Sequence, residues 1–137
     1  MTYEELVKKA YEAQSYSYSP YSGFQVGAAL LTKSGKVYTG CNIENAAFSP
    51  TNCAERTAIF KAVSEGERQF EAIAVVGNKR NAPEEEWEFC MPCGVCRQVM
   101  LEFVNPREFK IIAGKGKEIR TFTLGELLPE SFSPDMV

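Results

Sequence analysis

Apolar residues recur at helical spacing near the start of the chain, within residues 2–17. The members of this stripe are Leu6, Val7, Ala10, Tyr11 and Ala13. One face of an amphipathic helix would gather them. Thr2 and Glu5 have the spacing of a capping box, which satisfies the free N–H groups at a helix start. The pattern therefore predicts an amphipathic helix that begins at the second residue.

Four apolar segments have the length and composition of β-strands. Residues 24–32 and 37–41 are rich in apolar and β-forming residues, and a turn at 33–36 between them predicts a hairpin. Residues 72–76 are fully apolar and are followed by glycine and asparagine, which suits the buried interior of a parallel sheet. A fourth strand is predicted over residues 110–113.

Helical patterns alternate with these strands. Helices are predicted over residues 51–64, 93–103 and 123–128, and the loop 78–91 carries four glutamates and the only tryptophan. This order contains two β-α-β units, with no internal repeat and no linker. We therefore expect a single domain over residues 1–137, an α/β fold in which helices cover both faces of a mixed central sheet to give a three-layer α/β/α sandwich.

Composition and charge narrow the possible partners. The net charge is −3 and no stretch is rich in lysine or arginine, whereas proteins that bind polynucleotides normally carry a basic surface. No apolar run approaches the ~20 residues of a membrane span, and the first residues lack the features of a signal peptide. Five cysteines, an odd number, suit a reducing compartment. We expect a cytoplasmic protein that binds a small molecule, with no nucleic acid and no membrane.

Two short cysteine clusters carry the candidate chemistry. One is Cys-Ala-Glu-Arg at residues 53–56, and the other is Pro-Cys-Gly-Val-Cys-Arg at residues 92–97. Both lie where a predicted helix begins, and the N–H groups and dipole of a helix start favour thiolate over thiol. Thiolates from Cys53, Cys93 and Cys96 would make a zinc site with one open ligand position, as catalysis requires. The chain has no histidine, so every protein ligand must be sulfur or carboxylate.

The residues that follow Cys53 suggest how such a site would work. Glu55 is close enough in sequence to serve as general acid and base. Residues two apart point to opposite sides of a helix interior, so Cys53 and Glu55 share a site only if the helix end faces the metal. Zinc with three thiolates carries a surplus negative charge that opposes loss of a proton from water. Arg56, three residues after Cys53, is expected to hydrogen-bond the sulfurs and offset that surplus.

Simpler interpretations of the cysteines remain open at this point. Cys93 and Cys96 alone would also suit half of a structural zinc site, or a redox dithiol of the thioredoxin kind. A closed four-cysteine site would need Cys41 or Cys90. Cys41 ends a strand and is expected to pack as a small apolar residue. Closure by Cys90 would leave Glu55 without an evident role.

Five segments carry a resemblance to a known family. They are PYSGFQVGAA at residues 20–29, NIENA at 42–46, CAER at 53–56, PCGVCRQ at 92–98 and ELLPESF at 126–132. Together they closely resemble the small, all-cysteine cytidine deaminases of nucleoside salvage. The segments are ordered as in that family and span nearly the whole chain. The absence of histidine separates the chain from the His-x-Glu deaminases that act on polynucleotides.

The resemblance implies a reaction and a cofactor. The reaction is hydrolytic deamination of cytidine and 2′-deoxycytidine to uridine and 2′-deoxyuridine with release of ammonia. One Zn²⁺ per chain, held by Cys53, Cys93 and Cys96, would activate a water. Glu55 would move protons to ring N3 and to the departing ammonia, because the glutamate of zinc deaminases is a proton carrier rather than a ligand. A pocket that binds the 3′ side of the sugar is expected to accept both nucleosides.

The resemblance also assigns substrate contacts. Phe24 would stack on the pyrimidine, Asn42 and Glu44 would hydrogen-bond the ribose hydroxyls, and the backbone at Ala54 would read the base edge. Without the resemblance, Phe24 would be expected in the core, and Asn42 and Glu44 in a solvated turn.

Family members of this size are usually homotetramers in which neighbouring chains complete each active site. On that basis Ala46, Phe48 and Phe132 would reach into a neighbour's pocket. Phe48 stands where the family often has tyrosine, so a hydroxyl contact made there would be absent. The acidic stretch at residues 81–89 is longer than expected and carries no predicted role.

Three other functions compete with this one. A deaminase of a cytosine-nucleoside antibiotic such as blasticidin S would use the same cysteines and Glu55, although Asn42 and Glu44 favour an ordinary ribose. A non-catalytic zinc-stabilised module would bind its metal with four protein ligands. A thiol redox protein would form a disulfide between Cys93 and Cys96 and bind no zinc.

Overall fold

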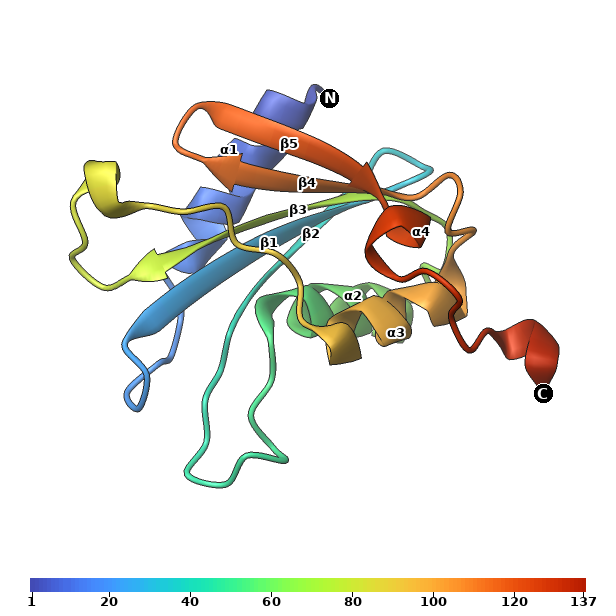
Figure 1. Cartoon of the computed structure of the whole chain (residues 1–137), viewed down its shortest axis with the longest axis horizontal. Helices are drawn as coiled ribbons and strands as arrows, with labels where there is room; N and C mark the ends of the chain where they lie inside the picture. Colours follow the sequence, from blue (N-terminus) through green and yellow to red (C-terminus); the bar gives the residue numbers. More distant parts are fainter.

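The computed structural model describes residues 1–137. Its helices and strands, in chain order, are α1 (Tyr3–Gln14), β1 (Phe24–Thr32), β2 (Val37–Cys41), α2 (Ala54–Ser64), β3 (Phe70–Lys79), the 3-10 turn η1 (Glu84–Glu86), α3 (Gly94–Phe103), β4 (Lys110–Lys115), β5 (Glu118–Thr123), α4 (Leu124–Leu127) and the 3-10 turn η2 (Pro134–Met136). The five strands form one sheet in the order β2-β1-β3-β4-β5 (Figure 1). None of the helices is long and apolar enough to cross a membrane.

The sheet is mixed, and helices cover both of its faces. β1 pairs antiparallel with β2 and β3, β3 pairs parallel with β4, and β4 pairs antiparallel with β5. On one face α1 buries Leu6, Val7 and Ala10 against the sheet. On the other face α2 and α3 pack over Leu30, Ile73 and related residues (Figure 1). The predicted three-layer α/β/α sandwich is confirmed.

Two crossover connections place α2 and α3 on the same face. Because β1 is antiparallel to both of its neighbours, β2 and β3 run parallel to each other. The units β2-α2-β3 and β3-α3-β4 are therefore both parallel crossovers, and such crossovers share one handedness. Both helices consequently begin at the carboxyl edge of parallel strands, where open α/β sheets bind ligands.

Several boundaries differ from the sequence prediction, and β3 and β4 are both longer than the predicted strands at 72–76 and 110–113. α2 begins at Ala54 and α3 at Gly94, later than the predicted starts, because Cys53 and Cys93 are the extended N-cap residues of these helices. The helix α1 ends at Gln14 rather than near residue 17. β5 was not predicted, since this edge strand is largely exposed and its sequence, EIRTFT, lacks an apolar run.

The acidic loop between β3 and α3 is fixed to the rest of the molecule by two aromatic side chains. The ring of Trp87 stacks on Tyr11 of α1 with 5.5 Å between centroids. The guanidinium carbon of Arg120 on β5 lies 4.2 Å from the centroid of the Phe89 ring. The face of an aromatic ring attracts a cation placed in this way. The segment that leads into α3 therefore approaches the sheet along a defined path.

Gly27 allows β1 to lie directly against α1. A Cβ atom at this position would lie 2.0 Å from the carbonyl oxygen of Ala10 and 2.7 Å from the backbone nitrogen of Gln14. Backbone atoms of a packed helix cannot move aside at low cost, so only glycine fits here.

We predict that Gly27→Ala lowers the free energy of unfolding by about 2 kcal/mol, because the helix must shift away from the sheet. Urea unfolding followed by circular dichroism measures this change. An unchanged midpoint would show that α1 is not held against β1 as described.

Candidate functional site

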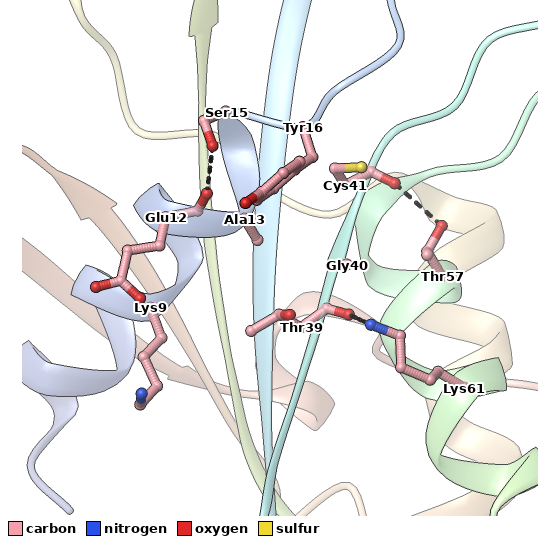
Figure 2. A pocket seen from close by; sticks show the side chains of 10 residues that line it. All are labelled: Lys9, Glu12, Ala13, Ser15, Tyr16, Thr39, Gly40, Cys41, Thr57 and Lys61. Carbon is pink, nitrogen blue, oxygen red and sulfur yellow. Dashed lines mark hydrogen bonds between the residues drawn. The ribbon is translucent and has the colours of Figure 1, made fainter.

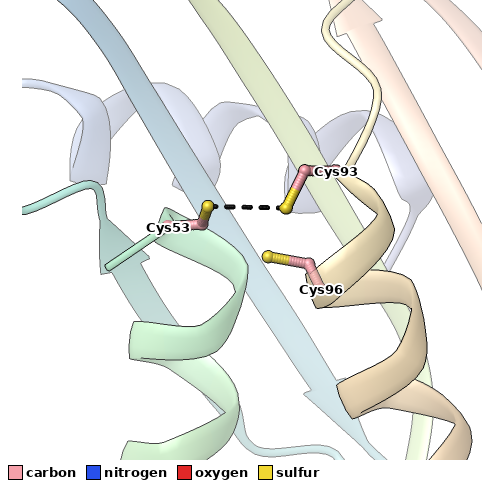
Figure 3. Close-up of side chains that lie close together, drawn as sticks. All are labelled: Cys53, Cys93 and Cys96. Carbon is pink, nitrogen blue, oxygen red and sulfur yellow. Dashed lines mark hydrogen bonds between the residues drawn. The ribbon is translucent and has the colours of Figure 1, made fainter. Parts of the chain in front are cut away.

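Three cysteine sulfurs converge where the N-termini of α2 and α3 meet (Figure 3). Cys53 is the N-cap residue of α2, Cys93 is the N-cap residue of α3, and Cys96 lies in the first turn of α3. Their Sγ atoms all lie within 4.8 Å of one another. The Sγ atoms of Cys53 and Cys93 are 3.7 Å apart. The helix ends thus face one another, which is the geometry that the spacing of Cys53 and Glu55 required.

This cluster fits one zinc ion. A tetrahedral zinc site with zinc–sulfur bonds of about 2.3 Å places its sulfurs about 3.8 Å apart, and the Cys53–Cys93 separation matches that spacing. All three donors are thiols, which bind zinc as thiolates. Three protein ligands leave the fourth position open, as in catalytic rather than structural zinc sites.

The electrostatics of the cluster favour a thiolate at Cys53. Hydrogen bonding with Cys96, supported by Arg56, lowers the pKa of Cys53 to about 5 although burial opposes the change. The same hydrogen bond raises the pKa of Cys96, and burial of its side chain adds to the rise. The surroundings therefore favour a thiolate at Cys53, at the positive end of α2.

Arg56 lies beside the sulfurs on the first turn of α2. Its Nη2 atom donates to the Sγ of Cys53 at 3.2 Å. Burial lowers the pKa of Arg56, but its interactions with Cys53 and Cys96 outweigh burial and raise it, so the side chain stays charged. Its Nε is buried and has no hydrogen-bond partner. A half-buried cation next to sulfur supports a cluster of negative charge.

Glu55 is the only buried carboxylate in the chain, with 3% of its surface exposed. Burial raises its pKa to about 7, and the nearby negative charge of Cys53 adds to the rise. A carboxyl group with a pKa near neutrality can both take up and release a proton at physiological pH. The structure thus places a protonatable carboxyl group beside the three cysteine sulfurs.

The two remaining cysteines are not part of the cluster. The side chain of Cys90 lies above Gly77 and lines the same cleft as Phe24. Burial raises the pKa of Cys90 to about 12, so it is a neutral thiol. Cys41 lies at the end of β2 in a cleft of about 620 Å³ between α1 and α2 (Figure 2). Of the predicted site residues, none lines that cleft. The geometry therefore favours an open three-cysteine site over a closed four-cysteine site.

Asn42 holds the start of β1 in place. Its Oδ1 accepts a hydrogen bond from the backbone N–H of Val26 at 2.9 Å, and its Nδ2 donates to the carbonyl of Phe24 at 2.8 Å. The hydroxyl of Ser17 also donates to Oδ1. Asn42 is thus a half-buried anchor rather than the solvated turn residue that its position alone suggested.

Glu44 orders the turn that precedes Phe24. Its carboxylate accepts hydrogen bonds from the backbone N–H groups of Tyr21 at 2.9 Å and Ser22 at 3.1 Å, and from the Ser22 hydroxyl. The Ser22 hydroxyl is the largest reason why the pKa of Glu44 lies below its ordinary value. The sequence motif at residues 42–46 therefore has a structural task that its composition did not reveal.

Three predicted residues lie apart from the sulfur cluster. Phe48 is 95% exposed and Phe132 is 63% exposed, and Ala46 is also exposed. Ala46 and Phe48 lie on the long connection between β2 and α2, which projects from the body of the molecule (Figure 1). Within one chain these side chains have no pocket to fill.

Arg97 follows Cys96 in the first turn of α3, and its role was not predicted from the sequence. Its Nε donates to the carbonyl of Pro92 at 2.8 Å, and its Nη1 donates to the carbonyl of Leu127 at 2.6 Å. The side chain thus ties the segment before Cys93 to the end of α4. The only sequence signal was its place directly after the second cysteine pair.

The fold and the cluster together define a zinc-binding α/β protein with an open ligand position and a buried carboxyl group beside it. Residues 1–112 match the family described as the cytidine and deoxycytidylate deaminase zinc-binding region. The chain belongs to this family.

Close relatives cover nearly the whole chain. A cytidine deaminase from Halalkalibacterium halodurans is 50% identical over 137 residues, covering 98% of this chain and 97% of that protein. One from Sporosarcina psychrophila is 46% identical over 135 residues, covering 98% and 94%. The crystal structure of cytidine deaminase from Burkholderia pseudomallei superposes with a TM-score of 0.86 at 44% identity, covering 96% of this chain and 100% of that one.

Removing the charge of Arg56 tests its part in the cluster. We predict that Arg56→Ala retains the fold but binds zinc at least about tenfold more weakly, because a charge-assisted hydrogen bond to a buried group is lost. Competition with a chromogenic chelator measures the zinc affinity. Arg68→Ala, which removes an exposed arginine, is the matched control. Equal zinc affinity in the parent and Arg56→Ala would refute the assigned role.

The raised pKa of Glu55 also makes a prediction about stability in the metal-free protein. Its folded pKa of about 7 lies above the ordinary 4.5, so the ionised form opposes folding. This cost is absent below about pH 4.5, grows towards pH 7 and reaches about 3 kcal/mol above it. Glu55→Gln should therefore unfold at higher urea than the parent at pH 8, with the difference vanishing near pH 4.5. A difference that does not change with pH would contradict the burial of an ionisable Glu55.

Proposed function

We propose that this protein catalyses the zinc-dependent hydrolytic deamination of cytidine and 2′-deoxycytidine to uridine and 2′-deoxyuridine, releasing ammonia. The observation that carries the proposal is the three-cysteine cluster at two helix starts with the protonatable carboxyl of Glu55 buried beside it. The relatives at 46% and 50% identity, which are cytidine deaminases, support the same reaction.

The role of Glu55 follows from its burial and its pKa. Cys53, Cys93 and Cys96 would hold the zinc ion, which would supply a water activated as a nucleophile near neutral pH. The carboxylate of Glu55 takes the proton that this water gives up and delivers a proton to ring N3 of the cytosine. After the water oxygen has bonded to C4, Glu55 takes the remaining proton of the new C4 hydroxyl and passes it to the amino group. The C4–N bond then breaks as the C4=O bond forms, so that water and cytidine become uridine and ammonia. A pKa near 7 suits a group that acts first as base and then as acid.

Four residues form the proposed nucleoside pocket on this chain. Phe24 stacks on the pyrimidine, and the backbone of the fully buried Ala54, between Cys53 and Glu55, reads the base edge. Asn42 and Glu44 bind the ribose hydroxyls. Their side chains still have a free amide hydrogen and free carboxylate lone pairs after the contacts within the chain are counted, which supports a second task in sugar binding.

We further propose that the protein assembles as a homotetramer in which neighbours complete each pocket. Phe48 and Phe132 are large apolar side chains that stay largely exposed in their own chain, and exposed apolar groups of this kind mark interaction surfaces. Ala46 on the same projecting connection as Phe48 would approach the neighbour with it. The tyrosine hydroxyl common at position 48 is absent, so Phe48 acts through packing alone.

Turnover tests the proposed reaction directly. We predict that the zinc-loaded protein converts both cytidine and 2′-deoxycytidine, measured by ultraviolet absorbance, and that Glu55→Gln loses at least about a thousandfold in kcat because the proton carrier is removed. Blasticidin S is the comparison substrate. Turnover of blasticidin S without turnover of cytidine would contradict the proposed substrate class. Equal activity in Glu55→Gln would contradict the mechanism.

Mixing two defective variants tests the shared pocket. Glu55→Gln lacks the proton carrier, and Phe132→Ala lacks the side chain proposed to enter a neighbour's pocket. Random mixed tetramers would contain both intact groups at about a quarter of their sites, because each group comes from a different chain. Co-refolded mixtures should therefore be more active at low cytidine than the mean of the two variants measured separately. Activity equal to the mean of the separate variants would contradict pockets shared between chains.

A further inference from the structure

The ring of Phe24 rests on a part of the sheet that has no side chain. Gly77 of β3 pairs with Val26 of β1 and lies next to Phe24 on the face that carries α2 and α3. A Cβ atom on Gly77 would lie 2.9 Å from Cε1 of Phe24 and 2.8 Å from Sγ of Cys90. Real Cβ atoms do not approach other atoms so closely, so the ring and the thiol meet above Gly77, and a side chain at this position would have to displace one of them.

The backbone of Phe24 is fixed separately from its ring. Its carbonyl accepts from Asn42 at 2.8 Å, and its N–H donates to the hydroxyl of Ser22 at 3.0 Å. The remaining freedom of the residue is rotation of the side chain. The groups that contact the ring therefore determine its orientation.

A cleft of about 360 Å³ lies beside the ring. Phe24, Gly77, Phe89 and Cys90 are among the residues that line it. The cleft offers room into which the ring could turn, and the thiol of Cys90 occupies the boundary. Cys90 is itself held at a defined place, because Phe89 is anchored under Arg120 on one side and Cys93 follows three residues later in the sulfur cluster.

We propose that Gly77 and Cys90 are positioning residues for substrate binding, which together set the orientation of the Phe24 ring and hence the depth of the base pocket. This inference rests on the proposed function, in which Phe24 stacks on the pyrimidine. A methyl group at position 77 pushes the ring away from the sheet and into the space of the base. Loss of the thiol at position 90 lets the ring turn towards the cleft. Both changes weaken binding of the base and leave the proton carrier and the metal ligands in place.

Steady-state kinetics of three variants test this role. Gly77→Ala is expected to raise KM for cytidine about tenfold with kcat within about twofold of the parent, because base binding rather than proton transfer is disturbed. Cys90→Ala is expected to raise KM by a smaller factor. The double variant Gly77→Ala/Cys90→Ala removes the closest contact made by the new methyl group, so its KM should fall below that of Gly77→Ala alone. Zinc content of each variant is measured in parallel and should stay at one per chain.

Gly114→Ala is the matched control. It adds a methyl group that would lie 2.6 Å from Cγ1 of Val7, an equally tight contact in the same sheet, but on the face covered by α1. It should lower stability and leave KM unchanged. If Gly77→Ala does not fold, Cys90→Ala and Cys90→Val remain informative, since one loosens the support of the ring and the other crowds it, and both are expected to raise KM.

The outcomes separate this inference from the proposed function. An active parent with unchanged KM in the variants at positions 77 and 90, or a double variant whose KM equals the product of the single effects, would overturn the positioning role alone. A parent that does not convert cytidine would overturn the proposed function and this inference with it.

Discussion

The three sulfurs of Cys53, Cys93 and Cys96 can converge only because the N-termini of α2 and α3 meet at one edge of the sheet. That meeting follows from topology, since β2 and β3 run parallel and each is followed by a helix on the same face. The glycines that let helices and strands touch maintain the arrangement, as at Gly40, where a Cβ atom would lie 2.5 Å from the carbonyl of Ala54. A shift of either helix relative to the other would separate the ligands.

The N-termini of α2 and α3 also stabilise negative charge at the site. Burying negative sulfur and a carboxyl group together is costly unless positive charge lies beside them. The helix termini and Arg56 supply that charge to Cys53, whereas Glu55, buried and close to the same sulfur, keeps a raised pKa. One local field therefore favours thiolate at the metal ligand and protonation at the neighbouring carboxyl. Two acidic groups thus acquire different roles from their surroundings.

The layers of the fold could be predicted from the sequence because apolar periodicity marks the helices and strands. The cysteine cluster and Glu55 could be predicted because they belong to short motifs. β5 was missed since its exposed residues carry no such periodicity. The anchoring tasks of Asn42 and Glu44 were missed because their partners, Phe24 and Ser22, are distant in sequence. The contact of Cys90 with Gly77 depends on the path of the acidic loop, and Trp87 and Phe89 reveal that path only when folded.

The central claim is that the sulfur cluster holds zinc with one position open to water. X-ray absorption at the zinc edge of the loaded protein tests it most directly, since sulfur and oxygen neighbours scatter differently and lie at different distances. The account predicts three sulfur neighbours at about 2.3 Å and one lighter neighbour at about 2.0 Å. Four sulfur neighbours would mean that Cys90 or Cys41 closes the site, and would contradict a catalytic metal centre.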